Sequence, residues 1–415
     1  MKNRDLDLAI VGAGLAGLAA ARRASELGLA VEVFEASDGI GGRVRSDVVD
    51  GYICDRGFQL INPNYPALAK YFQPQEFHRL ERSIDVLIGS KSYRLGDPRE
   101  GLASIPGNLA SETGTIFEKV RFLRYLSGIS RNGERSEGES FEDEMLQRGI
   151  GTFYSKVIGP FASGVFLNQP SRVSATVARE LIGYFMIGTP GLPQGGVGEV
   201  AKSMASGITV NLRSRVDEIG EDFIRVGRRK VKARAVIVAT DPQSARNLVD
   251  IDGKVSSRFN STMSGSTTWY HSSEDQDFPS VLRLDGGGDG PITNTIAISS
   301  LAPEYAPSGR TLISTTVMSA YGNEVTEARV RTHLAHLWRK DTSKWRLVAK
   351  YSIPKSLPLM SPGFQSEEVI DFTPRTKRRN SSMLRYLAGD FLVLPAQQGA
   401  VHSGVKAAEM VATNL

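Results

Sequence analysis

The sequence predicts an α/β protein in which a nucleotide-binding domain is interleaved with a second, mixed α+β domain. Three observations support this prediction: a glycine turn between a short apolar run and a helical pattern near the start, further glycine-containing segments in the middle and at the end, and two long stretches between them that lack such motifs. The length of 415 residues also exceeds that of one ordinary core, so two domains are expected.

The first segment has the pattern of a dinucleotide-binding unit. Leu8–Val11 is a short apolar run that predicts a buried strand. Apolar positions then recur at helical spacing from Leu15 to Leu27, where Gly28 ends the helix, and Leu29–Phe34 predicts a second buried strand. Strand, glycine turn, helix and strand are the context in which GxGxxG spacing predicts dinucleotide binding.

Each glycine of the turn has a predicted role. Gly12 permits the tight turn, Gly14 lets a pyrophosphate approach the backbone, and Gly17 lets the helix pack on the sheet. The helix amino terminus, with Leu15 and Ala16, would face the phosphates with free N–H groups and its positive dipole end.

The acid at the end of the second strand predicts contact with a ribose. Glu35 is placed to accept hydrogen bonds from the ribose diol, and Ala36 follows it at the same edge. An acidic residue here favours an adenosine ribose without a phosphate.

A second glycine pair makes the prediction more specific. Five residues separate Glu35 from Gly41-Gly42-Arg43, and here the sequence resembles the flavoprotein superfamily of amine oxidases, protoporphyrinogen oxidases and phytoene desaturases. The resemblance implies a Rossmann-like FAD-binding domain of the glutathione-reductase type, with Arg43 neutralising the pyrophosphate of FAD. The planar guanidinium suits this task better than a lysine would.

The carboxy-terminal segment resembles the flavin motif of the same family. It reads "YLAGDFLVLPAQQGAVHSGVKAAEMVA", with an AGD followed by a helix start. The resemblance implies that Gly389 and Asp390 contact the ribityl or phosphate part of FAD. Helix-start N–H groups of three residues would face the pyrimidine edge of the flavin: Gly399, Ala400 and Val401.

Two interior segments extend the resemblance. "DRGFQ" resembles the segment that passes the isoalloxazine ring, which implies contacts from Gly57, Phe58 and Gln59. "LPQGGVGEVAKSMA" resembles the return of the chain to the FAD domain, and Val216 falls where the family contacts adenine. No second strand-linked GxGxxG follows, and "DGGGDG" at 285–290 is interpreted as a loop, so a separate NAD(P)H domain is not expected.

The motifs divide the chain into two discontinuous domains. The FAD-binding domain is predicted at 1–73, 190–249 and 386–415, and the substrate-binding domain, a mixed α+β unit, at 74–189 and 250–385.

Composition excludes several classes of function. The single cysteine, Cys54, cannot form a disulfide within the chain and is interpreted as a packed thiol. There is no apolar run of 18 residues and no room for a signal peptide before the first motif, which predicts a cytoplasmic protein with peripheral membrane contact left open. The basic segments Arg225–Arg234 and Arg375–Arg379 are interpreted as a solvated hairpin and a loop, without nucleic-acid binding.

The histidines give no support for a metal site. His333 and His336 could share a helix face, but no third ligand stands nearby in the sequence. His402 lies inside the flavin motif, where it could approach the ring or turn to solvent.

The residues identify no catalytic group, and three hypotheses for function follow. The first is an FAD-dependent, phytoene-desaturase-like dehydrogenase or desaturase that transfers hydride from an apolar small-molecule substrate to flavin N5. The second is an amine oxidase or protoporphyrinogen oxidase that uses dioxygen, and the third is a flavin-binding protein without turnover. The absence of lysine in Ser266–Ser273 and of cysteine near the carboxy-terminal motif favours the first, with noncovalent FAD.

Overall fold

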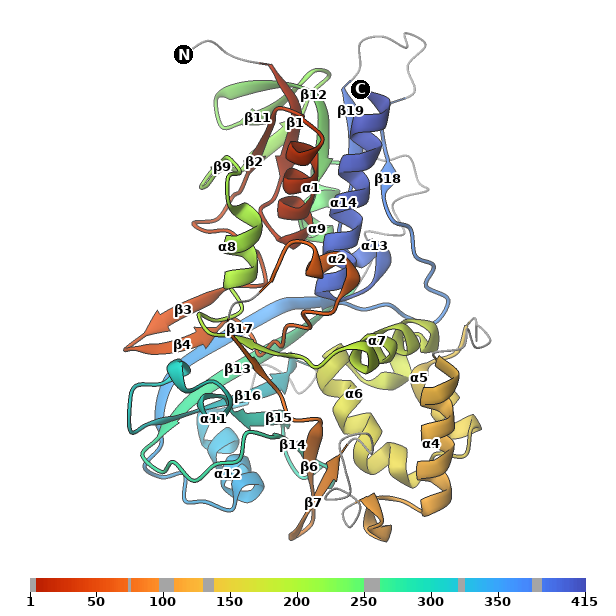
Figure 1. The fold of residues 1–415 in the computed structure, drawn as a ribbon, viewed down its shortest axis with the longest axis vertical. Coiled ribbons are helices and arrows are strands. Elements are labelled where there is room, and N and C mark those ends of the chain that lie inside the picture. Colours follow the sequence, from red (N-terminus) through yellow and green to blue (C-terminus); the bar gives the residue numbers. More distant parts are fainter. Residues whose placement is uncertain are drawn as a thin grey trace.

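The computed structural model describes residues 5–73, 76–96, 108–129, 138–249, 262–319, 325–374 and 383–415. Two large sheets lie at opposite ends of an elongated molecule, and the long strands β13 and β17 run from the lower sheet toward the upper one (Figure 1). The carboxy terminus lies at the far end of the upper sheet.

The upper sheet has the topology expected for a dinucleotide fold. Its strand order is β10-β11-β12-β1-β2-β9, and β19 pairs with β12 and β18. Its inner strands are parallel and carry fully buried residues such as Leu8 and Ile10. The bounds are β1 Leu6–Val11, β2 Val31–Phe34, β9 Val210–Asn211, β10 Val216–Ile219, β11 Phe223–Val226, β12 Arg229–Val238, β18 Ile370–Asp371 and β19 Leu384–Leu387.

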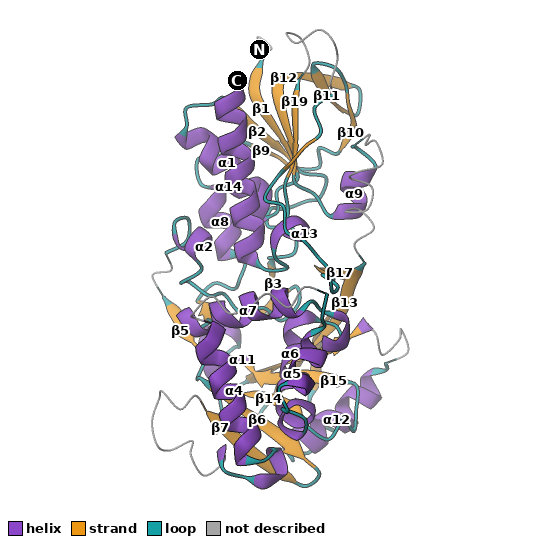
Figure 2. Cartoon of the chain, turned by 90° about the vertical axis from the view of Figure 1, so that its right-hand side faces the viewer, coloured by secondary structure: helices purple, strands orange, loops and turns teal. Residues whose placement is uncertain are grey.

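Helices cover one face of this sheet (Figure 2). They are α1 (Leu15–Glu26), α14 (Gln397–Asn414), α8 (Glu199–Ala205) and the short α2 (Pro66–Ala69). The close contact between α1 and α14 needs a glycine, because a Cβ on Gly404 would lie 2.0 Å from the carbonyl oxygen of Ala16.

The lower sheet is mostly antiparallel. Its order is β17-β13-β16-β15-β14-β6-β7, with β14 and β6 parallel. The bounds are β6 Ser83–Ile88, β7 Lys91–Gly96, β13 Met263–Ser273, β14 Leu282–Asp285, β15 Ile292–Ala297, β16 Thr311–Met318 and β17 Arg346–Pro358.

Helices flank the lower sheet on two sides (Figure 1). One group, beside β15 in the figure, consists of α4 (Ile116–Ile129), α5 (Phe141–Gln147), α6 (Gly159–Phe166) and α7 (Ala175–Ile187). On the other side α12 (Glu327–Trp338) packs on the sheet through buried Leu334 and Trp338.

Short elements connect the two halves. The strands are β3 (Ser46–Val49), β4 (Tyr52–Asp55), β5 (Phe77–Arg79) and β8 (Gly191–Pro193); the helices are α9 (Pro242–Arg246), α11 (Ile298–Leu301) and α13 (Asp390–Val393); and the 3₁₀ turns include η3 (Ser111–Thr113) and η6 (Pro303–Tyr305). Within the described ranges no helix is both long and apolar enough to cross a bilayer.

The predicted elements of the first segment are confirmed. β1 contains the predicted strand, α1 spans the predicted helix except for Leu27, Gly28 comes next at φ +82°, and β2 begins two residues after Leu29. Arg225–Arg234 lies in the hairpin of β11 and β12, as predicted, whereas Arg375–Arg379 lies outside the described residues.

The predicted domain boundary at 385/386 needs correction. It cuts through β19, which pairs with β12, and β18 joins the same sheet from residue 370 onward. The boundary was predicted too late in the chain because it was taken from the AGD motif. This motif begins where β19 ends, so it does not reveal the strand that precedes and positions it.

Candidate cofactor and substrate site

A cavity of about 1470 Å³ runs from the glycine turn after β1 into the group of helices α4, α6 and α7. It therefore joins the upper sheet to the helices beside the lower one. All but three of the nineteen residues predicted to contact the cofactor line this cavity. They are Gly12, Gly14, Leu15, Ala16, Glu35, Ala36, Gly41, Gly42, Arg43, Gly57, Phe58, Gln59, Val216, Gly389, Asp390 and Ala400.

The glycines of this turn differ in their surroundings. Two of them pack closely against backbone atoms, and one faces open space. Gly12 has φ +103°, and a Cβ on it would lie 2.7 Å from the carbonyl oxygen of Ala239. A Cβ on Gly17 would lie 1.9 Å from the carbonyl oxygen of Gly12, so Gly17 packs against the turn and does not line the cavity. A Cβ on Gly14 would meet nothing within 4 Å. Gly14 thus leaves the space that a pyrophosphate needs beside the start of α1.

The second glycine pair closes over the first turn. Gly41 donates its N–H to the carbonyl oxygen of Ala13 at 2.8 Å. Gly42, at φ +59°, would place a Cβ 3.2 Å from the Cα of Gly14. The two loops therefore approach each other through backbone alone, and this narrow cradle fits a diphosphate.

Glu35 is held in place at the end of β2. One carboxylate oxygen accepts the N–H of Ala13 at 2.7 Å, and the other accepts that of Ser37 at 2.8 Å. Each oxygen has further acceptor capacity, so the fixed carboxylate can also bind a ribose diol. Val216, at the start of β10, lines the cavity beside Arg215 and Asp217.

Arg43 and Asp390, predicted to act on FAD from distant segments, are paired. The guanidinium donates to Asp390 Oδ1 at 2.7 Å and to the Ser356 carbonyl oxygen at 2.9 Å. Burial disfavours the charged form of Arg43, but the charge and hydrogen bond of Asp390 and the charge of Asp241 together outweigh this and raise the pKa of Arg43 above its usual value. The pair places one fixed cation and one fixed anion at the polar end of the cavity.

A second ion pair at this end was missed by the sequence analysis. Lys355, on β17, lies 3.4 Å from Asp241 Oδ1, and both residues line the cavity. Asp241 also caps α9 by accepting the N–H groups of Gln243 and Ser244 at 3.2 Å. The Asp-Pro pair at a helix start is a signal that could have identified this cap.

The start of α14 differs from the prediction. The helix begins at Gln397, so the N–H of Ala400 already donates to the carbonyl oxygen of Ala396 at 3.1 Å. Gly399 and Val401 are buried and do not line the cavity. Gln397 lines it instead, and its buried Oε1 has no hydrogen-bond partner among the described residues. This unsatisfied acceptor is suited to an N–H of a bound ligand.

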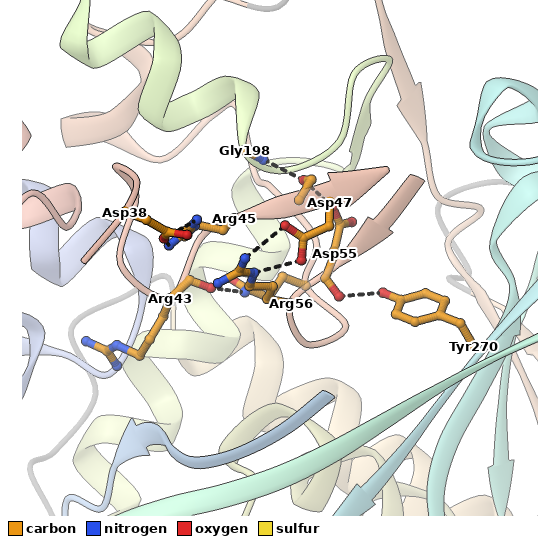
Figure 3. A network of polar contacts seen from close by, with 10 residues as sticks. Asp38, Arg43, Arg45, Asp47, Asp55, Arg56, Gly198 and Tyr270 are labelled. Carbon is orange, nitrogen blue, oxygen red and sulfur yellow. Dashed lines mark hydrogen bonds and ion pairs between the residues drawn. The ribbon is translucent and has the colours of Figure 1, made fainter. Parts of the chain in front are cut away.

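The ring-facing segment is anchored by a buried carboxyl (Figure 3). Asp55 is 1% exposed, and its side chain accepts hydrogen bonds from Ser46 Oγ, from Val197 N–H at 3.1 Å and from Tyr305 OH at 3.3 Å. Tyr270 OH donates to the Asp55 carbonyl oxygen at 2.9 Å. Burial raises the pKa of Asp55 to about 7 despite these bonds. Asp55 therefore links β3, the segment around Val197 and the lower half of the molecule. It immediately precedes Arg56 and Gly57, which line the cavity.

The far part of the cavity is mostly apolar. Its lining from α4 to α7 includes phenylalanines that no motif identified, and the rings of Phe161 and Phe185 meet edge to face at 6.1 Å. The lining apolar residues of this region are Ile116, Val120, Phe122, Leu123, Leu126, Phe141, Phe153, Val157, Ile158, Phe161, Ala162, Val165, Phe166, Leu167, Leu181, Ile182, Phe185 and Met186.

The histidines and the cysteine lie outside this lining. His333 Nδ1 accepts the N–H of Ile292, and His333 Nε2 lies 3.1 Å from Asp285, whose carboxylate holds the glycine loop that follows it. His402 contacts Glu368 at 2.6 Å. Cys54 is buried, which raises its pKa to about 12. Among the described residues no group of three or more His, Cys, Asp or Glu could hold a metal ion.

Comparison with known proteins identifies the family. Residues 15–412 match the profile of the family described as flavin containing amine oxidoreductase. The chain belongs to this family. The predicted resemblance and fold class are confirmed, and FAD is the cofactor of these oxidoreductases.

Curated relatives match only segments of the chain. Protoporphyrinogen oxidase 2 of Arabidopsis thaliana is 27% identical over 175 residues, which are 40% of this chain and 34% of that protein. A putative flavin-containing monoamine oxidase of Mycobacterium tuberculosis is 44% identical over 106 residues, 24% of this chain and 23% of that protein. The matched part spans about a third of the first of these relatives and less of the second.

Solved structures match over nearly the whole length. A putative protoporphyrinogen oxidase from Exiguobacterium sp. 255-15 has a TM-score of 0.74 at 16% identity, covering 98% of this chain and 99% of that one. Putrescine oxidase bound to putrescine has a TM-score of 0.73 at 16% identity, with coverage of 98% and 99%. At this level of identity the likeness shows the fold.

Proposed function

We propose that the protein is an FAD-dependent dehydrogenase or desaturase that removes two electrons from an apolar substrate. The observation that supports this most directly is the cavity itself, which joins the glycine cradle to a phenylalanine-rich chamber. An apolar molecule in the chamber would lie beside the segment Gly57–Gln59, where the family resemblance places the flavin ring. Burial of its surface would supply the binding free energy.

The carboxylates of the cavity argue against an amine as the preferred substrate. Among the described lining residues, Glu35, Glu81, Asp217, Asp241 and Asp390 each already accept a hydrogen bond from a neighbouring protein group. None of them belongs to the described lining contributed by α4 to α7, so a substrate ammonium in the chamber would be buried without a counter-ion. A neutral apolar substrate needs no counter-ion.

Bound FAD would supply the two-electron acceptor, and the residues of the chain supply binding, orientation and exclusion of water. Glu35 would hold the ribose, Arg43 would neutralise the diphosphate, and Gln397 would accept a hydrogen bond. The chamber would hold the substrate against the ring and keep water out. Because Cys54 does not line the cavity, we propose that FAD is held without a covalent bond to cysteine.

A second candidate is oxidation of a porphyrinogen or an amine with dioxygen. It is supported by the relatives named as a protoporphyrinogen oxidase and a putative monoamine oxidase, and the cavity is also large enough for a cyclic substrate. It differs from the first in that reduced flavin would be reoxidised quickly by dioxygen with release of hydrogen peroxide.

Anaerobic mixing of the FAD-loaded protein with panels of donors tests the proposal. We expect apolar cyclic or isoprenoid compounds to bleach the visible flavin band and simple amines to leave it unchanged. Peroxide released in step with amine or porphyrinogen consumption would establish the second candidate instead. Intact FAD that responds to no donor class, and isomerises no test compound, would contradict both.

A further inference from the structure

We propose that the substrate of this cavity carries a carboxylate at one end and that Lys119 binds it at the outer part of the apolar chamber. The inference rests on the proposed function and narrows it from an apolar substrate to an amphipathic acid.

Lys119 is a buried cation within a mostly apolar wall. It lies on α4, is 8% exposed and lines the cavity among phenylalanine and leucine side chains. Its Nζ is 5.9 Å from the centre of the Phe153 ring. Placing an ammonium in apolar surroundings is costly unless a partner compensates its charge.

The described residues compensate this charge only in part. Nζ donates to the carbonyl oxygen of Ala110 at 2.6 Å, and no carboxylate of the described residues forms an ion pair with it. The neighbouring carboxylate of Glu118 accepts hydrogen bonds from Thr115 and from the N–H groups that follow Gly151. Because an ammonium has three donors, Lys119 retains capacity for an anionic ligand.

The pKa of Lys119 is consistent with incomplete compensation. Burial lowers it below its usual value, and the charges of Glu118 and Glu112 only partly oppose this. A bound carboxylate would favour the protonated form and raise the pKa again.

The position of Lys119 indicates how such a ligand would lie. Ile116, Val120 and Leu123, on the same helix, line the cavity and are also 49%, 39% and 46% exposed, so α4 borders the opening. An amphipathic acid would enter with its apolar end first. Its carboxylate would stay at Lys119 while the apolar part reaches toward the flavin segment. One ammonium balances one carboxylate.

The experiment compares ligands that differ only in the head group. Oleate and oleyl alcohol are titrated into the FAD-loaded protein below their aggregation limits, and binding is followed by the change in the visible flavin spectrum. We expect the wild type to bind oleate about tenfold or more tightly than the alcohol, as a hydrogen bond to a charged group allows. In Lys119→Met this preference should disappear while affinity for the alcohol is kept, and Lys119→Arg should retain it.

A matched control removes an equal charge elsewhere. Lys202, on α8, is 66% exposed and does not line the cavity, so Lys202→Met should keep the preference for oleate. If Lys119→Met does not fold, Lys119→Gln, which also lacks the charge, takes its place and should likewise lose the preference for oleate.

The outcomes separate the two proposals. Equal binding of acid and alcohol by the wild type, or an unchanged preference in Lys119→Met, would overturn the role of Lys119 and leave the apolar-substrate proposal standing. Failure of both ligands to bind, in a protein that holds FAD, would count against the apolar chamber as a substrate site and hence against both.

Discussion

The two ends of the cavity are built from different parts of the polypeptide. At the nucleotide end, backbone forms the surface, because Gly12, Gly14, Gly41 and Gly42 bring two loops within contact distance of each other. At the chamber end, side chains from α4, α6 and α7 form the surface. A backbone surface tolerates almost no added atom, whereas a side-chain surface can be repacked at lower cost. Substitutions at the two ends should therefore differ in kind.

The largest effect is expected from Gly17→Ala. The new Cβ would lie 1.9 Å from the carbonyl oxygen of Gly12, a backbone atom that cannot move aside. We expect a loss of unfolding free energy greater than the about 1–3 kcal/mol typical of overpacking, or failure to fold. Chemical denaturation followed by circular dichroism measures it.

Gly14→Ala is the matched control for that experiment. Its Cβ would meet nothing within 4 Å, and its φ of −72° suits alanine. The unfolding free energy of the apoprotein should change by less than about 0.5 kcal/mol. FAD affinity should fall by about tenfold or more, because the methyl group projects into the space assigned to the pyrophosphate. Unchanged FAD affinity would contradict that assignment.

Asp55 joins the two halves, and its titration should appear in the pH dependence of stability. Its pKa is raised from 3.8 to about 7, so the folded protein binds this proton more tightly than the unfolded chain. The contribution to stability is complete below about pH 4 and is lost as the pH rises through about 7. Three units correspond to up to about 4 kcal/mol.

Asp55→Asn isolates this contribution. Asparagine has the shape of the neutral acid, so the variant should lack this pH dependence and gain stability relative to the wild type as the pH rises from 4 to 7. Urea denaturation at several pH values measures the difference. Parallel curves for the two proteins would show that Asp55 does not titrate in this range.

Glu35→Lys should weaken FAD binding by roughly ten- to a hundredfold, or about 1.5–3 kcal/mol. The substitution removes an acceptor for the ribose and also leaves the N–H groups of Ala13 and Ser37 without their partner. Cofactor content after desalting and fluorescence titration measure the loss. Glu221→Lys makes the same charge change at an exposed position outside the cavity and should bind FAD normally.

The nucleotide end could be predicted because its signals are local. Three glycines, a helical pattern and an acid within one short segment define β1, α1 and β2 without help from the rest of the chain. Arg43 and Asp390 were each predicted, but their pairing was not, because 347 positions separate them. Lys355 and Asp241 carry no common sequence signal and meet only through the fold.

The rest could not be predicted because packing decides it. Gly399 lies in the first turn of α14, as expected of a helix-start residue, but a Cβ there would be 2.2 Å from the carbonyl oxygen of Leu394, so Gly399 packs against backbone and does not line the cavity. Phe161 and Phe185 have the pattern of core residues, and sequence spacing does not distinguish a ring that faces a cavity from one that faces a core. Buried Lys119 was overlooked for the same reason.

The smallest effect is expected from substitutions on the outer surface of the chamber end. Peripheral membrane contact of this surface stays a prediction. On α4, Phe117 is 73% exposed and Ile116 49%, and Arg121 and Arg124 are exposed on the same helix. Apolar side chains flanked by arginines suit an anionic bilayer.

We expect the wild type to sediment with phosphatidylglycerol-containing vesicles and Phe117→Ser to bind them several-fold more weakly, since part of the free energy of burying one phenylalanine, about 1.5–3 kcal/mol, is lost. Val48→Ser is the control, because Val48 is 74% exposed on β3, one of the elements that connect the two halves, and this substitution should leave vesicle binding unchanged. Equal loss of vesicle binding in both variants would assign the binding to general hydrophobicity. If the wild type does not sediment with the vesicles, the chamber end has no membrane contact that distinguishes it from the nucleotide end.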